Sequence, residues 1–222
     1  MPKILITLVI NFVLLFTAFA DEYKKQDNKS WHIYIQQTDD KAHKATLTQA
    51  YEQLEKDLLE VEQLIPKKHL RHLKKVKIWI SVNTQAGAAY HPSEQWLRNN
   101  GRNPKMAMSI EIQNAQNYID WLKYQPMIIL HELSHAYHHQ VLGYNHKEIL
   151  NTYKKAKQSG IYDSVQYVAG GKKRAYAMNN DKEYFAELTE AYFGKNDFYP
   201  FTRSELKEHD PSAYKLIEKI WK

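Results

Sequence analysis

The residues His131-Glu132-Leu133-Ser134-His135 form an HExxH motif, a pattern that can hold a metal ion. On an α-helix, residues i and i+4 lie on one face, so the two imidazoles would point at a single centre. Two histidine nitrogens presented in this way are typical zinc ligands. Glu132 flanks that face, where its carboxylate could take a proton from a water at the metal. The motif therefore predicts hydrolytic metal chemistry.

The sequence around the motif predicts a helix that is packed into a core. Ile129, Leu133 and Ala136 lie opposite the two histidines on a helical wheel, which gives the helix an apolar back. Pro126 stands where a first helical turn favours proline, and Gly143 is a good helix stop. We therefore expect the two histidines on a core helix rather than on a loop.

A catalytic zinc ion usually has three protein ligands, so a third ligand must come from elsewhere. The longer pattern HExxHxxGxxH would need a histidine at position 141, where Val141 stands. His138 and His139 lie further along the same helix, but three side chains of one straight helix cannot easily converge on one ion. We expect these two histidines to surround the site rather than to bind the metal.

A second predicted helix, over residues 181–193, supplies carboxylates. Glu183, Glu187 and Glu190 are spaced at i, i+4 and i+7, which places them on one face. Their apolar neighbours indicate that this face is not simply a solvated acidic stripe. One of Glu183 and Glu187 could bind the metal while another glutamate orients a histidine through its other ring nitrogen. The spacing alone does not choose between Glu183 and Glu187.

The motif helix, together with residues 176–193, YAMNNDKEYFAELTEAYF, resembles the zinc peptidase domain of the anthrax lethal factor family. That family has HExxH, then a tyrosine and, seven residues later, a glutamate that opens an ExFAE segment. Tyr176 and Glu183 have this spacing. The resemblance implies that Glu183 is the third ligand of one zinc ion per chain, as in gluzincins. It also implies that Glu187 supports the ligands and that Tyr176 stabilises the oxyanion.

Residues 1–20 have the pattern of a secretory signal peptide. Lys3 is followed by the apolar run Ile4–Phe16, and Ala18-Phe19-Ala20 is a cleavage signature before the polar residue Asp21. The run is short for a membrane span. We expect a Sec-type signal cleaved after Ala20 and a secreted or periplasmic protein without a stable membrane anchor.

The remaining segment, residues 21–222, has a length that suits a single catalytic domain. The sequence contains no cysteine, so no disulfide can stabilise this domain. The formal net charge is +6, with lysines clustered at residues 67–68, 74–75 and 172–173. No nucleic-acid-binding motif accompanies them, so we expect solvated basic faces, no nucleic-acid partner and a monomer.

The order of the predicted elements indicates an α+β fold. A strand at 31–37, a helix over 47–65 that ends at Pro66 and a strand at 76–82 form a βαβ unit with parallel strands. After a long loop at 83–105, a strand at 106–112 is expected near the sheet edge, where a peptide could add as an extra strand. The later elements are a helix at 114–123, a helix at 146–159 before Gly160, a strand at 161–168 with a turn at 169–171, the helix at 181–193 between Asn179-Asn180 and Gly194, and a helix from Asp210-Pro211 to Trp221.

Together these patterns predict a zincin-like metallopeptidase domain. A small mixed, twisted sheet with an edge strand would pack against the HExxH helix and the glutamate-bearing helix. The predicted activity is hydrolysis of peptide bonds in a peptide or protein substrate, with Glu132 as general base. Two alternatives remain: a zinc amidase that acts on a non-peptide or cell-wall amide, and a non-catalytic zinc-binding module. The module would need neither Glu132 nor Tyr176.

Overall fold

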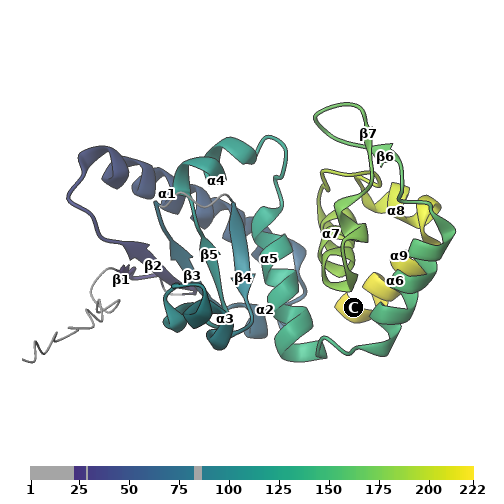
Figure 1. Cartoon of the computed structure of the whole chain (residues 1–222), viewed down its shortest axis with the longest axis horizontal. Coiled ribbons are helices and arrows are strands. Elements are labelled where there is room, and N and C mark those ends of the chain that lie inside the picture. The colour runs from purple at the N-terminus through teal and green to yellow at the C-terminus, as the bar shows by residue number, and fades with distance from the viewer. Residues whose placement is uncertain (1–22, 29, 83–86) are drawn as a thin grey trace, which may run out of the picture.

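The computed structural model describes residues 23–28, 30–82 and 87–222. Within them a mixed sheet and helix α1 lie on one side, a helical C-terminal part lies on the other, and helix α5 runs between the two (Figure 1). The sheet has the strand order β1-β2-β3-β5-β4. The expected α+β fold with a small mixed sheet is therefore confirmed. The predicted signal peptide lies outside the described residues.

The first half of the chain contains the predicted βαβ unit, and its two strands are parallel as expected. Helix α1 begins after Asp40, whose side chain accepts a hydrogen bond from the His43 backbone N–H, and it ends before Pro66. The segment after Pro66, expected to be a plain connection, forms a further short helix. Its Leu70 and Leu73, three residues apart, are both buried on one face of this helix. The bounds are β1 Tyr23–Lys25, β2 His32–Gln36, α1 Lys41–Leu64, α2 Lys67–Leu73 and β3 Lys77–Ile80.

The strand expected at 106–112 lies next to the sheet edge but is not the edge strand, so the prediction that a peptide could add to it is wrong. Strand β5, Ser109–Ile112, pairs in parallel with β3 and in antiparallel with β4, Ala88–His91, which is the edge strand. All four residues of β5 are buried, and the polar Glu111 is accommodated because His91 and Arg102 bond to its carboxylate. Strand β4 lies within the segment expected to be a loop, which also contains α3, Glu94–Asn99, and η1, Pro104–Met106.

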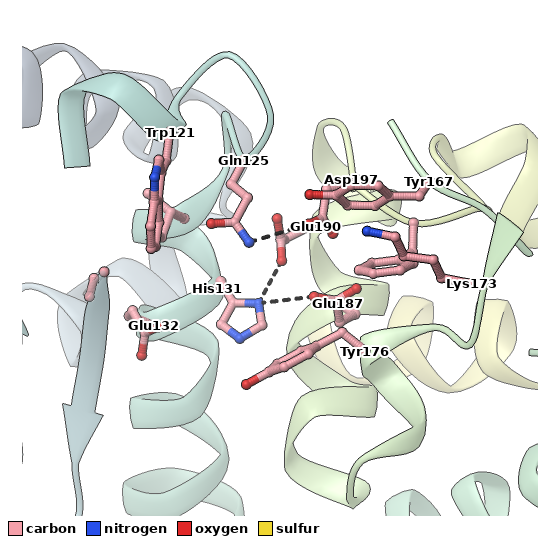
Figure 2. A pocket seen from close by; sticks show the side chains of 14 residues that line it. Trp121, Gln125, His131, Glu132, Tyr167, Lys173, Tyr176, Glu187, Glu190 and Asp197 are labelled. Atoms are coloured by element: carbon pink, nitrogen blue, oxygen red, sulfur yellow. Dashed lines mark hydrogen bonds and ion pairs between the residues drawn. The ribbon is translucent and has the colours of Figure 1, made fainter. Parts of the chain in front are cut away.

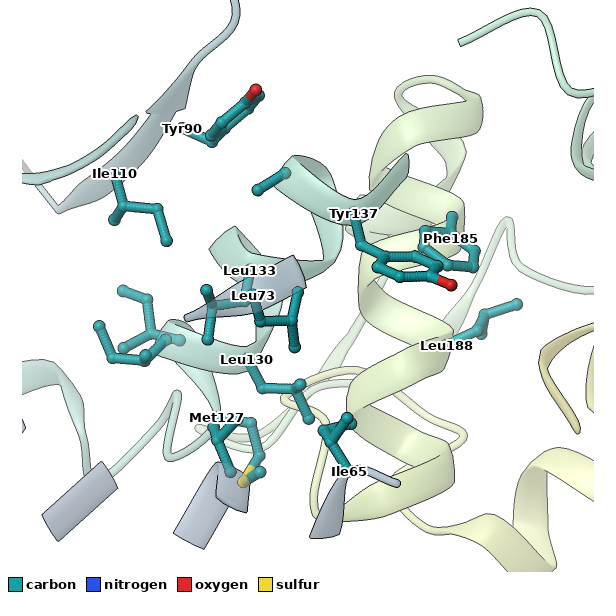
Figure 3. Close-up of a cluster of buried hydrophobic side chains, with 14 of the residues drawn as sticks. Ile65, Leu73, Tyr90, Ile110, Met127, Leu130, Leu133, Tyr137, Phe185 and Leu188 are labelled. Carbon is teal, nitrogen blue, oxygen red and sulfur yellow. The ribbon is translucent and has the colours of Figure 1, made fainter. Parts of the chain in front are cut away.

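The motif helix α5 spans Ile128–Tyr137, so it begins two residues after Pro126 rather than at it. It continues as a π-helical turn, η2, His138–Leu142, and stops at Gly143, whose φ of 80° suits glycine. All residues of α5 are buried. Figure 3 shows Leu130 and Leu133 among apolar side chains of other elements, including Phe185 and Leu188 on the neighbouring helix α7. The expected core position of this helix is confirmed.

The C-terminal part is held together by helix α7, which spans Asp181–Phe193 as predicted. Asn180 caps it by accepting from the N–H groups of Lys182 and Glu183, and it ends at Gly194. The strand expected at 161–168 is reduced to a two-residue strand in a small hairpin. The bounds are α4 Ala115–Trp121, α6 Lys147–Ser159, β6 Val165–Gln166, β7 Lys172–Lys173, η3 Tyr176–Met178, α8 Arg203–His209 and α9 Pro211–Trp221.

Trp221, at the end of α9, connects this part to the motif helix. Its ring stacks on Tyr137 of α5 at a centroid distance of 4.5 Å and also contacts Phe185 and Phe193 of α7. Its indole N–H donates to Thr189 Oγ1. One aromatic side chain thus packs against both helices that carry the candidate site. None of the described helices is long and apolar enough to cross a membrane.

Candidate metal centre

Three side chains from helices α5 and α7 converge on one point. The Nε2 atoms of His131 and His135 lie 3.1 Å apart, and Glu183 Oε2 lies 3.1 Å from the first and 3.2 Å from the second. In a tetrahedral zinc site with bonds of 2.0–2.1 Å, ligand atoms are about 3.3 Å from one another. The triangle therefore has the dimensions and the nitrogen and oxygen donors that fit a zinc ion.

Local structure fixes each corner of this triangle. One helical turn separates His131 from His135, so their side chains share a face of α5. Glu183 lies in the first turn of α7, where the Asn180 side chain accepts from its backbone N–H at 3.0 Å. The helices themselves pack against each other through their apolar sides. The sequence predicted both helices, but their contact is a tertiary feature.

Behind His131, the structure brings Glu190 closer than Glu187. The Nδ1 atom of His131 is 2.6 Å from Glu190 Oε1 and 3.7 Å from Glu187 Oε1. A hydrogen bond from Nδ1 fixes the tautomer that leaves Nε2 free to bind a metal. By distance, Glu190 rather than Glu187 is the carboxylate that contacts this ring. The sequence did carry a signal for Glu190, since it shares a helix face with the other two glutamates.

The centre concentrates negative charge around two imidazoles. Burial alone would lower the pKa of His131, but hydrogen bonds to Glu183 and Glu190 raise this pKa well above its ordinary value. Burial opposes ionisation of Glu183, yet the two histidines hold its pKa well below its ordinary value. Burial raises the pKa of Glu190 to about 7, against the effect of His131. Burial, reinforced by the charge of Glu190, raises the pKa of Glu187 well above its ordinary value. Such a centre is electrostatically suited to a cation.

Glu132 lies beside the triangle and is held by the edge strand. Its Oε2 accepts a hydrogen bond of 2.7 Å from the backbone N–H of Tyr90 in β4. Glu132 is only 7% exposed, so it is almost completely buried. No sequence pattern indicates this contact, because the donor is a backbone group that any residue at position 90 except proline would provide.

Tyr176 begins η3 and reaches toward the same centre. Its ring centroid is 6.4 Å from that of His131, and its side chain extends across the pocket below this imidazole (Figure 2). The side chain is 47% exposed, so its hydroxyl is accessible. Burial of the other half, followed by the charge of Glu183, raises the pKa of the phenol. Tyr176 thus remains a hydrogen-bond donor at neutral pH.

The two further histidines of the motif helix lie outside the triangle, as expected. His138 is buried in η2, where its ring packs edge-on against Tyr144 and Phe185. His139 Nδ1 is 2.9 Å from the hydroxyl of Tyr90. Burial lowers the pKa of His138 to about 3, so this ring is neutral. Both histidines belong to the packing around α5.

A cavity of about 350 Å³ opens beside the triangle. Helix α5 contributes His131 and Glu132 to its wall, and Glu187 and Glu190 of α7 face it from the other side (Figure 2). The remaining described lining residues come from the start of β4, the end of α4 and the loop after it, the first turn of α5, the β6–β7 hairpin, η3 and the loop after α7: Gly87, Ala88, Trp121, Gln125, Ile128, Tyr167, Lys173, Tyr176, Asp197 and Phe198. A ligand in this cavity would contact the candidate metal centre directly.

Comparison with known proteins gives little support beyond this geometry. No protein-family model matches the sequence. No curated protein matches it either. Among solved structures, a Pro-Pro endopeptidase from Paenibacillus alvei is similar at 20% sequence identity, over 85% of this chain and 95% of that one, with a TM-score of 0.43. The likeness is too weak to carry an argument, so the function is inferred from the residues of this chain.

Proposed function

We propose that this protein is a zinc-dependent metallopeptidase of the gluzincin type, with a catalytic centre like that of the lethal factor family. The observation that carries the proposal is the triangle formed by His131 Nε2, His135 Nε2 and Glu183 Oε2, with separations of 3.1–3.2 Å. A structural zinc site usually has four protein ligands and no neighbouring base. Three converging ligands with Glu132 beside them favour a catalytic site.

In this proposal His131, His135 and Glu183 hold the zinc ion, and Glu190 orients His131. When bound, zinc lowers the pKa of a water molecule and polarises the carbonyl group of the bond to be cleaved. Glu132 takes the proton of the attacking water and passes it to the leaving amine. The hydrogen bond from the Tyr90 N–H to Oε2 keeps this carboxylate in place beside the triangle.

Tyr176 donates a hydrogen bond to the carbonyl oxygen as negative charge develops on it. Donors of this kind contribute about 3 kcal/mol to transition-state stabilisation. Tyr176→Phe should therefore lower kcat by about 100-fold and leave KM nearly unchanged. An equal loss in kcat for Tyr51→Phe, a partly exposed tyrosine on α1, would show that the effect is not specific.

The substrate is a peptide or protein segment in an extended conformation. The N–H of Tyr90 points away from β5 and toward Glu132, so the backbone of Ala88, two residues earlier, points the same way. An extended peptide can add to this side of β4. The edge-strand hypothesis that the sequence suggested for residues 106–112 therefore transfers to β4.

The protein acts outside the cytoplasm, after removal of residues 1–20. This part of the proposal rests on the sequence pattern of the signal peptide alone. Mass spectrometry of the exported protein should give an N-terminus at Asp21. An exported form that retains Met1 would contradict it.

The central experiment combines zinc analysis with a cleavage assay. The purified mature chain should contain one zinc per chain and cleave peptides from a quenched-fluorescent library in a chelator-sensitive manner. Glu132→Gln should abolish cleavage and keep the zinc, whereas Glu60→Gln, an exposed glutamate on α1, should behave like the wild type. Full activity of Glu132→Gln would refute the mechanism. Cleavage of cell-wall amides but of no peptide would instead favour the amidase alternative.

A further inference from the structure

The cavity beside the metal centre has a strongly acidic inner wall. Glu187 and Glu190 project into it from α7, and Asp197 projects from the loop that follows. Each of these three carboxylates belongs to a residue only 3% exposed. We call the part of the cavity bounded by these residues and by the aromatic rings of Trp121, Tyr167 and Phe198 the acidic pocket.

These buried carboxylates have fewer partners than their charge requires. Asp197 accepts a hydrogen bond from Gln125 at 3.2 Å, and Glu190 is bonded to His131. Glu187 Oε2 is buried and has no hydrogen-bond partner in the described part of the chain. Burial also raises the pKa of Asp197, against the effect of Gln125. A buried carboxylate without a partner is costly, so a cation placed among these groups would be strongly stabilised.

The described lining of the cavity contains one ammonium group, that of Lys173. Among the described lining residues, Lys173 is the one lysine or arginine, and it lies on the exposed hairpin strand β7. Its Nζ sits 4.0 Å from the centroid of the Tyr167 ring. That contact demonstrates that the aromatic wall accepts a cation. Trp121 faces Tyr167 from the opposite side of the pocket (Figure 2).

We propose that the acidic pocket binds the side chain of a lysine or arginine next to the bond that the protein cleaves. This inference rests on the proposed peptidase function, because it names the substrate class for the same site. The cavity that contains the acidic pocket is also lined by His131, Glu132 and Tyr176, so a side chain in the pocket belongs to a residue at the reacting bond. The aromatic rings contact the aliphatic part of that side chain, and the carboxylates bind its charged end.

A binding experiment tests the pocket without any cleavage. The zinc-loaded wild type is titrated with n-butylammonium, which mimics the end of lysine, and with n-butanol as the uncharged probe of similar size. Affinity is obtained from the rise in the unfolding midpoint with probe concentration. The ammonium should bind at least about tenfold more tightly than the alcohol, since hydrogen bonds to charged groups have this strength. Equal binding of the two probes, or binding of neither, would overturn the proposal.

Two variants locate the binding. Asp197→Asn should lower the affinity for n-butylammonium by about tenfold. The carboxylate of Asp39 is fully exposed and pairs with Lys44, so Asp39→Asn should leave this affinity unchanged. Lys173→Gln removes the competing positive charge and should tighten binding. If Asp197→Asn does not fold, Lys173→Gln is the deciding variant. An affinity of Lys173→Gln for n-butylammonium that is unchanged or weaker than that of the wild type would place the ammonium outside the pocket.

Cleavage assays separate this proposal from the peptidase proposal. Peptides with lysine or with norleucine on either side of the scissile bond are compared, and lysine should raise kcat/KM by about tenfold at one of the two positions. Cleavage without a lysine preference would reject the pocket and leave the peptidase intact. Ammonium binding without any cleavage would reject the peptidase and leave the pocket intact.

Discussion

Glu190 and Glu187 differ in their contact with His131, and this difference predicts unequal effects on zinc affinity. Glu190 Oε1 is 2.6 Å from His131 Nδ1, a charge-assisted hydrogen bond, whereas Glu187 Oε1 is 3.7 Å away. Replacing a carboxylate that orients a ligand histidine typically lowers metal affinity 10–100-fold. We therefore expect Glu190→Gln to weaken zinc binding by about 1.4–2.7 kcal/mol.

Glu187→Gln is the matched control. Glu187 Oε1 lies 3.7 Å from His131 Nδ1, beyond hydrogen-bond distance, so this substitution removes no hydrogen bond to the ligand histidine. We expect zinc affinity within about threefold of the wild type.

The assay is a competitive zinc titration against a chromophoric chelator at pH 7.5, with circular dichroism of the zinc-free variants as a check on folding. A larger loss of zinc affinity for Glu187→Gln than for Glu190→Gln would refute the inference, drawn from the two distances, that Glu190 orients His131. It would instead support the role that the lethal factor resemblance gives to Glu187.

Three further substitutions test features that hold the site. Asn180→Ala removes the side-chain acceptor for the backbone N–H groups of Lys182 and Glu183. The free energy of unfolding, measured by urea denaturation, should therefore fall by about 1 kcal/mol. Gly194→Ala would place a Cβ 2.6 Å from the sulfur of buried Met127, so the free energy of unfolding in urea should fall by about 1–3 kcal/mol. Burial raises the pKa of Asp57, against hydrogen bonds from Tyr118 and Gln53, so the folded state binds the proton more tightly than the unfolded state. This contribution is fully present below about pH 4 and is lost as the pH rises through the raised pKa. The stability of Asp57→Asn relative to the wild type should therefore increase between pH 4 and pH 7, and a pH-independent difference would contradict the reasoning.

Elements marked by local signals were predicted closely from the sequence. Helix α7 begins and ends where Asn180 and Gly194 indicated, because capping and termination depend on neighbours in the chain. Helix α9 likewise starts at Pro211 after the cap Asp210. Glu183 was one of two candidates from spacing, and only the contact between helices brings its carboxylate to the two histidines.

Strand β4 shows where sequence reasoning failed and why. Its four residues, AAYH, form a short segment with only a weak alternation of apolar and polar side chains, which does not indicate a strand. The surrounding segment is rich in glycine, proline and asparagine. Its pairing with β5 is a long-range choice that local propensity does not encode. For the same reason the hydrogen bond from Tyr90 to Glu132 could not be anticipated, although it positions the proposed general base.

The position of Trp221 bears on the order in which this protein folds. The proposed ligands are all synthesised by residue 183, but the ring that packs against both of their helices arrives 38 residues later. Chains emerge with the N-terminus first, and a core that lacks a large aromatic side chain is loosely packed. The metal centre should therefore remain unformed until α9 docks. For the export and hydrolysis that we propose, this order would keep the centre inactive while the chain is still unfolded.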